Sequence, residues 1–315
     1  MTTLRPARTL SLLALVGVLL AACSSSIGTL TTLPPASPAA SSESPVTKAP
    51  FIPQLISAET IMGPNRYLFG VLDATGQTSI AAPDLKLTVA FQADGASPTE
   101  IPAAPATFIW AIPDERGVYA LPVTFPSAGN WTALFKANGG GLPDATVAVQ
   151  FEVKAKGLAI PIGGKAYPSQ TPTAATADDI AKIATDPKPD PSFYTTSVAR
   201  AIAEHRPFVL VFATPAFCTS KQCGPTLDGI KAVARDEQGI VFINVEPYRL
   251  SYADGRLQPV LDAANQLQPV DAVREWGILS EPWVFVVDGK GIVRGSFETV
   301  VSAEELKAAI AAARG

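Results

Sequence analysis

The sequence is poor in the residues that build most metal sites. Its 315 residues include three cysteines, two methionines and a single histidine, whereas copper sites are built from histidine with cysteine or methionine. Lysine and arginine form no cluster, and the formal net charge is −4. A nucleic-acid-binding surface needs a basic patch, so that class of function is excluded. We expect no metal centre, no cofactor and no nucleic-acid partner.

The first cysteine, Cys23, follows a short apolar stretch at residues 10–20, which Arg5 and Arg8 precede. This stretch is too short for a mature membrane span but has the length of a signal-peptide core. The ending Leu20-Ala-Ala-Cys23 resembles the bacterial lipobox, which implies cleavage before Cys23 and a diacylglycerol on its sulfur. An ordinary signal peptide cut at an Ala-x-Ala site is the alternative.

We therefore predict a signal peptide over residues 1–22 and a lipid anchor at Cys23. Residues 23–50 are rich in Ser, Pro, Ala and Thr and nearly free of charge, which is typical of an unstructured tether. The predicted location is the bacterial cell envelope, either outside the cytoplasmic membrane or on the periplasmic face of an outer membrane. The lipid on Cys23 makes the membrane a partner.

Residues 51–155 carry short alternating apolar and polar runs between turn residues, which indicates an all-β antiparallel sandwich. The runs are residues 66–72, 85–91, 117–125, 130–136 and 145–153. The spacing of Gly117, Tyr119, Phe125 and Trp131 resembles the Ig-like modules of some extracytoplasmic bacterial proteins. We expect a spacer or partner-binding module.

The sandwich has little with which to bind a metal or a ligand. Residues 51–155 hold Met62 but no histidine and no cysteine. Aromatic side chains at strand spacing usually face inward, so we expect Trp110, Tyr119 and Trp131 to lie in the core.

A Pro-rich connector is expected over residues 156–196, where prolines oppose regular helix. The hydrophobic pattern of residues 197–315 is different. Apolar strands alternate with helical spacing, which is typical of an α/β layer. Ser302 and Glu305 form a capping box for the last helix. The expected helices are 197–205, 227–234 and 302–312, and the expected strands are 208–212, 240–245, 283–287 and 291–297.

The other two cysteines, Cys218 and Cys223, lie between a buried strand and a helix start. This pair, the order of the elements and the segment Trp276-Gly-Ile-Leu-Ser-Glu281-Pro282 together resemble the thioredoxin fold. Membrane-attached members of that family are the nearest in pattern. The resemblance covers about 197–315 and implies an α/β thioredoxin-like domain with a redox dithiol. It also implies that Glu281-Pro282 is a cis peptide facing the dithiol.

Several residues depart from the thioredoxin pattern. Four residues separate Cys218 from Cys223, too far for a disulfide within one regular helix, so Cys218 is expected in the loop. Lys221 and the helix N-terminus would favour a thiolate, whereas Glu281 would oppose one. The strand at residues 208–212 carries no buried acid.

The chain is also compared with two other cysteine-containing families, the Sco-type copper proteins and the peroxiredoxins. Sco-type copper proteins add a histidine near the cis-proline, but here Ser280 and Glu281 precede Pro282. The one histidine, His205, is expected to interact with the last carbonyls of a helix. Peroxiredoxins need a threonine three residues before the reactive cysteine, where this chain has Ser220. Peroxidase activity is therefore a remote alternative.

Two function classes remain open. One is a lipid-anchored thiol-disulfide oxidoreductase that uses Cys218, Cys223, Glu281 and Pro282 on a protein thiol or disulfide. The other is a non-catalytic binding or assembly lipoprotein in which Cys218 and Cys223 form a structural disulfide. An insertion at residues 247–269 is either a partner-selecting loop over the dithiol or a surface decoration.

Overall fold

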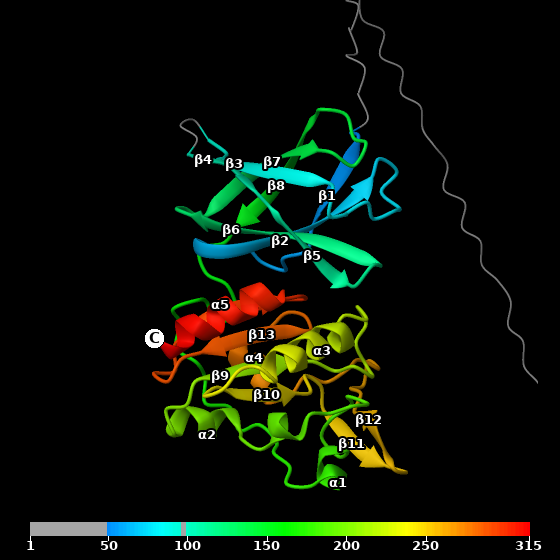
Figure 1. Cartoon of the computed structure of the whole chain (residues 1–315), viewed down its shortest axis with the longest axis vertical. Helices are drawn as coiled ribbons and strands as arrows, with labels where there is room; N and C mark the ends of the chain where they lie inside the picture. The colour runs from blue at the N-terminus through cyan, green and yellow to red at the C-terminus, as the bar shows by residue number, and fades with distance from the viewer. Residues whose placement is uncertain (1–48, 96–98) are drawn as a thin grey trace, which may run out of the picture. The chain divides into compact units, whose positions relative to one another are not determined.

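The computed structural model of the chain describes residues 49–95 and 99–315, which belong to one compact unit (Figure 1). The expected signal peptide, Cys23 and nearly all of the tether lie outside these residues. The described part is rich in β-structure, with three four-stranded sheets and one two-stranded sheet. None of its helices is long and apolar enough to cross a membrane.

Two antiparallel sheets are formed by residues 51–153. One has the strand order β1 (Phe51–Leu55), β2 (Gly63–Asp73), β6 (Arg116–Phe125) and β5 (Thr107–Ile112), and the other the order β4 (Glu100–Pro105), β3 (Lys86–Ala93), β7 (Gly129–Asn138) and β8 (Thr146–Val153). Alternate residues of these strands point into one shared core, which is rich in aromatic rings. The expected β-rich character of this part is therefore confirmed.

The aromatic residues of these sheets divide between core and surface. Trp131 and Tyr119 are fully buried, as expected, and the Tyr119 hydroxyl donates to the Leu85 carbonyl oxygen at 2.8 Å. The prediction for Trp110 was wrong, because its side chain is 38% exposed. On β5 the neighbouring residues Ile109 and Ala111 take the buried face, and period-two alternation leaves Trp110 on the other face.

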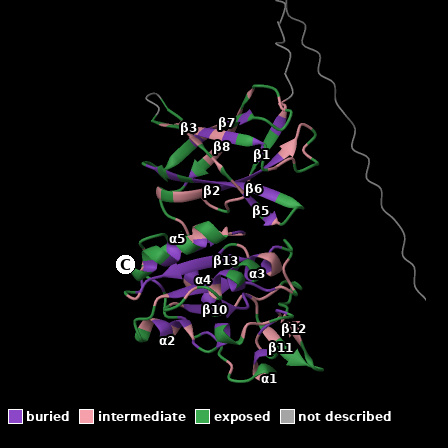
Figure 2. Cartoon of the chain, viewed as in Figure 1, coloured by how far each residue is buried: buried purple, intermediate pink, exposed green. Residues whose placement is uncertain are grey.

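Four further strands form a mixed sheet in the order β10 (Val241–Val245), β9 (Phe208–Phe212), β13 (Trp283–Val287) and β14 (Val293–Glu298). β10 is parallel to β9, and β13 is antiparallel to both β9 and β14. Every residue of β9, β10 and β13 is buried (Figure 2). The residues of β9 and β13 are all apolar and those of β10 are apolar except for Asn244, which is typical of strands covered on both faces.

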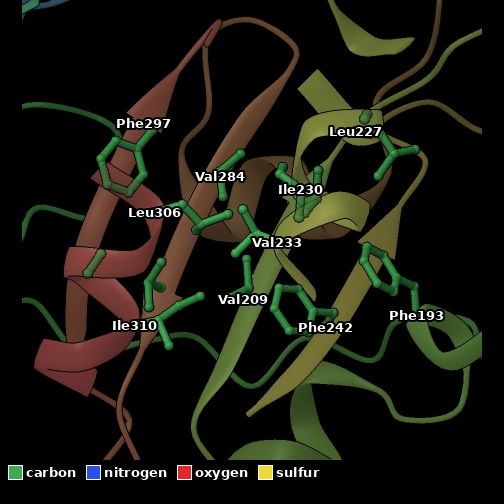
Figure 3. Close-up of a cluster of buried hydrophobic side chains, with 14 of the residues drawn as sticks. Phe193, Val209, Leu227, Ile230, Val233, Phe242, Val284, Phe297, Leu306 and Ile310 are labelled. Atoms are coloured by element: carbon green, nitrogen blue, oxygen red, sulfur yellow. The ribbon is translucent and has the colours of Figure 1, made fainter. Parts of the chain in front are cut away.

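Helices cover both faces of this sheet. α3 (Cys223–Ala234) and α5 (Ala303–Arg314) pack on one face, where Leu227, Ile230, Leu306 and Ile310 meet Val209 (Figure 3). The other face packs against α2 (Val198–Ala203) and α4 (Asp271–Trp276). The expected capping box of α5 is confirmed, because Glu305 N–H donates to Ser302 Oγ and Ser302 N–H donates to the Glu305 carboxylate.

Two segments of the second half contain more structure than the sequence pattern predicted. The connector holds the single-turn helix α1 (Ala177–Ile180), which Thr176 caps, and the 3₁₀ turn η1 (Pro191–Tyr194), which begins with a proline. Proline is tolerated at a helix start because its missing N–H has no partner there. The insertion forms the hairpin β11 (Leu250–Ala253) and β12 (Arg256–Pro259) around a turn at Asp254-Gly255.

Candidate dithiol site

Cys218 and Cys223 lie at the end of β9 where α3 begins. Cys218 is in the loop, as the spacing predicted, and its side chain is half-buried. Cys223 is the first residue of α3 and is fully buried. The helix therefore starts two residues before Pro225, which lies in its first turn. One sulfur is accessible to a partner and the other is screened from solvent.

Both cysteines are free thiols in this structure. The disulfide expected from the sequence is thus not formed here, and the geometry described below is that of the reduced pair. Formation of a Cys218–Cys223 disulfide stays a prediction.

Hydrogen bonds converge on the Cys218 sulfur. The Cys223 N–H, at the N-terminus of α3, donates to Cys218 Sγ at 3.3 Å, and Ser220 Oγ lies 3.3 Å from the same sulfur. The hydrogen bond from the Cys223 thiol is the largest of several that lower the pKa of Cys218 to about 5, against the opposing effect of burial. The same hydrogen bond, together with burial, raises the pKa of Cys223. The resulting pair is a Cys218 thiolate beside a Cys223 thiol.

Lys221 contributes less to this site than expected. Its side chain is exposed, and its backbone has a φ of 60°. The lowered pKa of Cys218 comes from hydrogen bonds to its sulfur, not from the charge of Lys221. His205 is also exposed, and its Nδ1 lies 3.3 Å from the Gly289 carbonyl oxygen instead of the helix carbonyls expected.

The segment before β13 meets the cysteine loop. The Glu281–Pro282 peptide bond is cis, as predicted, and Ser220 Oγ donates to the Glu281 carbonyl oxygen at 3.4 Å. Because Ser220 also contacts Cys218, one hydroxyl joins this peptide to the sulfur. The structure thus brings together all four residues that the sequence singled out, Cys218, Cys223, Glu281 and Pro282.

The Glu281 side chain is held by the insertion. Tyr248, one residue beyond Pro247, donates its hydroxyl to Glu281 Oε2 at 2.7 Å. Burial raises the pKa of Glu281, and the negative charge of Cys218 raises it further. By reciprocity a charged Glu281 opposes the thiolate, which is the effect expected from the sequence. One residue of the insertion, Tyr248, therefore contacts the acid that precedes Pro282.

A second acid near the dithiol, Glu246, was missed by the sequence analysis. It directly follows β10, is only 7% exposed, and accepts hydrogen bonds from the Thr185 N–H and hydroxyl through Oε1. Burial raises its pKa. The signal that could have identified it is a lone acid at the end of a strand that is apolar except for Asn244.

Thr214 links this acid to Cys223. Its hydroxyl lies near the Glu246 carboxyl, but without the geometry of a full hydrogen bond, since Thr214 Oγ1 and Glu246 Oε2 both lack a partner within the described part of the chain. The backbone of Thr214 hydrogen-bonds to the Cys223 thiol. Thr214 thus lies between the buried carboxyl of Glu246 and the buried sulfur of Cys223.

In comparisons with known proteins, no family model and no curated protein matches the chain. Within residues 49–95 and 99–315, no group of three His, Cys, Asp or Glu side chains is arranged to hold a metal ion.

Proposed function

We propose that the protein is a thiol-disulfide oxidoreductase in which Cys218 attacks and Cys223 resolves. The observation that carries this proposal is the asymmetry of the pair: Cys218 is half-buried with a pKa lowered to about 5, and Cys223 is buried with a raised pKa. Thiol-disulfide exchange needs one accessible thiolate and one nearby thiol that stays protonated until the second step.

The reaction takes place in two exchange steps. The Cys218 thiolate attacks one sulfur of a partner's disulfide, which forms a mixed disulfide and releases the partner's other sulfur as a thiolate. Cys223 then loses its proton and attacks Cys218, which closes the Cys218–Cys223 disulfide and releases the second partner thiolate. Two electrons pass to the partner, and the reverse sequence oxidises a partner dithiol.

The surroundings of the pair support a thioredoxin-like α/β domain at residues 197–315. A mixed sheet with helices on both faces, a dithiol between the central strand β9 and the helix α3, and a cis proline opposite that dithiol all agree with the resemblance. With the lipobox at Cys23, the same proposal places the protein in the cell envelope as a lipid-anchored protein. An Ig-like sandwich at residues 51–155 would serve as a spacer or partner-binding module.

Glu246 has a defined role in this scheme. The buried Cys223 must lose its proton in the second step, and Glu246 is the buried acid that lies beside Thr214, whose backbone hydrogen-bonds to the Cys223 thiol. Because burial raises its pKa, Glu246 is a stronger base than an ordinary carboxylate.

We expect Glu246→Gln to slow closure of the disulfide by about 10-fold or more, because a general base typically contributes at least that much. The variant should also stabilise the fold at pH 8. The folded-state pKa of Glu246 is raised, so stability is highest below the ordinary carboxyl pKa and falls as the pH rises through the folded value. Gln keeps the oxygen that accepts from Thr185 and removes the charge.

The measurement combines stopped-flow kinetics of mixed-disulfide decay with thermal unfolding at pH 4 and pH 8. Glu115→Gln, at an exposed glutamate, is the matched control and should change neither quantity. Equal behaviour of the two variants would remove Glu246 from the scheme.

The proposed function as a whole is tested by equilibrating the protein with a glutathione buffer. A redox-active pair interconverts reversibly between dithiol and disulfide, whereas a structural disulfide in a binding protein resists reduction.

A further inference from the structure

Gln222, which lies between the loop of Cys218 and the first residue of α3, has a buried polar side chain. It is only 2% exposed, and its Nε2 donates to the Ala111 carbonyl oxygen on β5. β5 belongs to the two sheets formed by residues 51–153, which we call the N-terminal sheet pair. One side chain thus joins this sheet pair to the loop that carries the reactive sulfur.

The backbone of β5 makes Ala111 available as the acceptor. The pairing of β5 with β6 passes from Trp110 directly to Ile112, so Ala111 has no counterpart on β6. Such a bulge bends its strand and leaves the extra residue unpaired in the ladder. A buried amide needs a hydrogen-bond partner, and the carbonyl oxygen at this bulge provides one for Gln222.

Apolar packing and a further hydrogen bond hold the same contact. Thr226, in the first turn of α3, donates its hydroxyl to the Thr299 carbonyl oxygen at 3.0 Å. The next residue, Val300, packs in a buried cluster whose other members belong to the N-terminal sheet pair and include Ile109 and Ala111. The start of α3 is therefore held against β5 directly and also through the segment that follows β14.

The main chain of Gln222 takes part in the dithiol site. Its N–H donates to Ser220 Oγ at 3.3 Å, and the same oxygen lies 3.3 Å from Cys218 Sγ. Backbone hydrogen bonds from Gln222 and Cys223 help to lower the pKa of Cys218. The Gln222 side chain makes no capping hydrogen bond to α3. The Cys218 sulfur, and not a capping side chain, accepts from the first N–H of the helix.

We propose that Gln222 is a positioning residue, through which the N-terminal sheet pair fixes the backbone groups that donate to the Cys218 sulfur. Hydrogen bonds stabilise a thiolate while their donors stay directed at it, and a loop without this anchor is freer to turn its N–H groups away. The N-terminal sheet pair is then more than a spacer. This inference rests on the proposed function, because thiol-disulfide exchange is what gives the thiolate a use.

The first test removes the donor and keeps the bulk, through Gln222→Met. Alkylation of Cys218 by iodoacetamide is followed by mass spectrometry of the reduced full chain between pH 4 and pH 9, and we expect its midpoint to rise by about 1 pH unit. Gln238→Met, the same change at an exposed glutamine beyond α3, is the control and should keep the wild-type midpoint. A folded Gln222→Met protein with the wild-type midpoint would overturn the proposal.

A second pair of variants tests the contact from the sheet side, and it applies even where Gln222→Met fails to fold. Ile109→Ala removes packing between β5 and Val300, whereas Leu87→Ala makes an equal truncation in the core between the two N-terminal sheets. We expect both to lower the thermal stability, but only Ile109→Ala to raise the midpoint of Cys218. An unchanged midpoint in Ile109→Ala, or equal shifts in both variants, would contradict anchoring by β5.

The outcomes keep this inference separate from the proposed function. The titratable groups coupled to Cys218 are Cys223 on α3, Glu281 before Pro282 and Tyr248 in the insertion, and every variant keeps them. Because iodoacetamide needs no partner protein, the midpoints can be compared even if the protein reduces no disulfide. A wild-type protein that fails to catalyse the reduction of insulin by dithiothreitol would refute the oxidoreductase, while the midpoints still decide whether Gln222 positions the sulfur.

Discussion

Alkylation of Cys218 by iodoacetamide is expected to rise through a midpoint near pH 5 and to be constant above about pH 7. The thiolate is the reacting form, and the hydrogen bonds to Cys218 lower its pKa to about 5, against about 8.5 for an ordinary cysteine. At pH 6 the thiolate fraction then exceeds that of an ordinary cysteine by roughly 300-fold. The lower nucleophilicity of a low-pKa thiolate reduces the gain in rate to about 10-fold.

The measurement is the rate of carboxamidomethylation at Cys218, followed by mass spectrometry of the reduced protein between pH 4 and pH 9. Cys223→Ala is the informative variant, because it removes the thiol whose hydrogen bond contributes most to the low pKa. Its midpoint should move up toward 8.5. A wild-type midpoint above pH 8, unchanged in Cys223→Ala, would show that the pair does not generate a thiolate.

The largest expected loss of activity follows from Cys218→Ser. The hydroxyl is a poor nucleophile at neutral pH, so the reduction of insulin should fall by roughly 10³-fold or more. Cys223→Ser should instead permit the first exchange and block the second, because the group that attacks Cys218 is missing. We expect this variant to accumulate a mixed disulfide between Cys218 and the partner.

Non-reducing gel electrophoresis and peptide mapping distinguish these outcomes. The adduct should contain Cys218, and dithiothreitol should release the partner from it. Trapping through Cys223 in Cys218→Ser would reverse the assigned roles, and equal residual activity in both variants would contradict a two-step exchange.

The sheet of the second half could be predicted because its strands leave a strong pattern. β9 and β13 are unbroken apolar runs of strand length, and Asn244 alone interrupts the apolar run of β10. Such a composition is typical of strands buried on both faces. The cysteine pair and Pro282 were placed through a resemblance, since nothing in their local spacing shows that a loop and a distant proline meet. In the structure, hydrogen bonds through Ser220 show that the cysteine loop contacts the segment before Pro282.

The strands β4 and β5 were not predicted. β4 has the sequence Glu-Ile-Pro-Ala-Ala-Pro and lies at the edge of its sheet, where proline is tolerated because one side of the strand needs no donor. Its composition is that of a loop. β5 is likewise an edge strand. It was not among the expected strands, so Trp110 was assigned to the core without a strand pattern to define which face it occupies.

Glu246 was missed for a different reason. The sequence search looked for a buried acid on β9, the strand that leads to Cys218, but this chain places the acid after the neighbouring strand β10. Strand order in the sheet decides which residues adjoin the dithiol, and a parallel β9–β10 pair brings the two strand ends together. The number of residues between Glu246 and the cysteines in the sequence does not indicate that they lie close together in the fold.

The reduction potential of the Cys218–Cys223 pair tests the central claim most directly. The full chain is equilibrated in glutathione buffers of defined ratio, quenched with acid, and the two states are separated by their mass after alkylation. A redox-active pair should interconvert reversibly at a potential above about −300 mV, the range of labile disulfides. A pair that stays oxidised below that potential, or that forms no disulfide at any ratio, would contradict thiol-disulfide exchange as the function of this site.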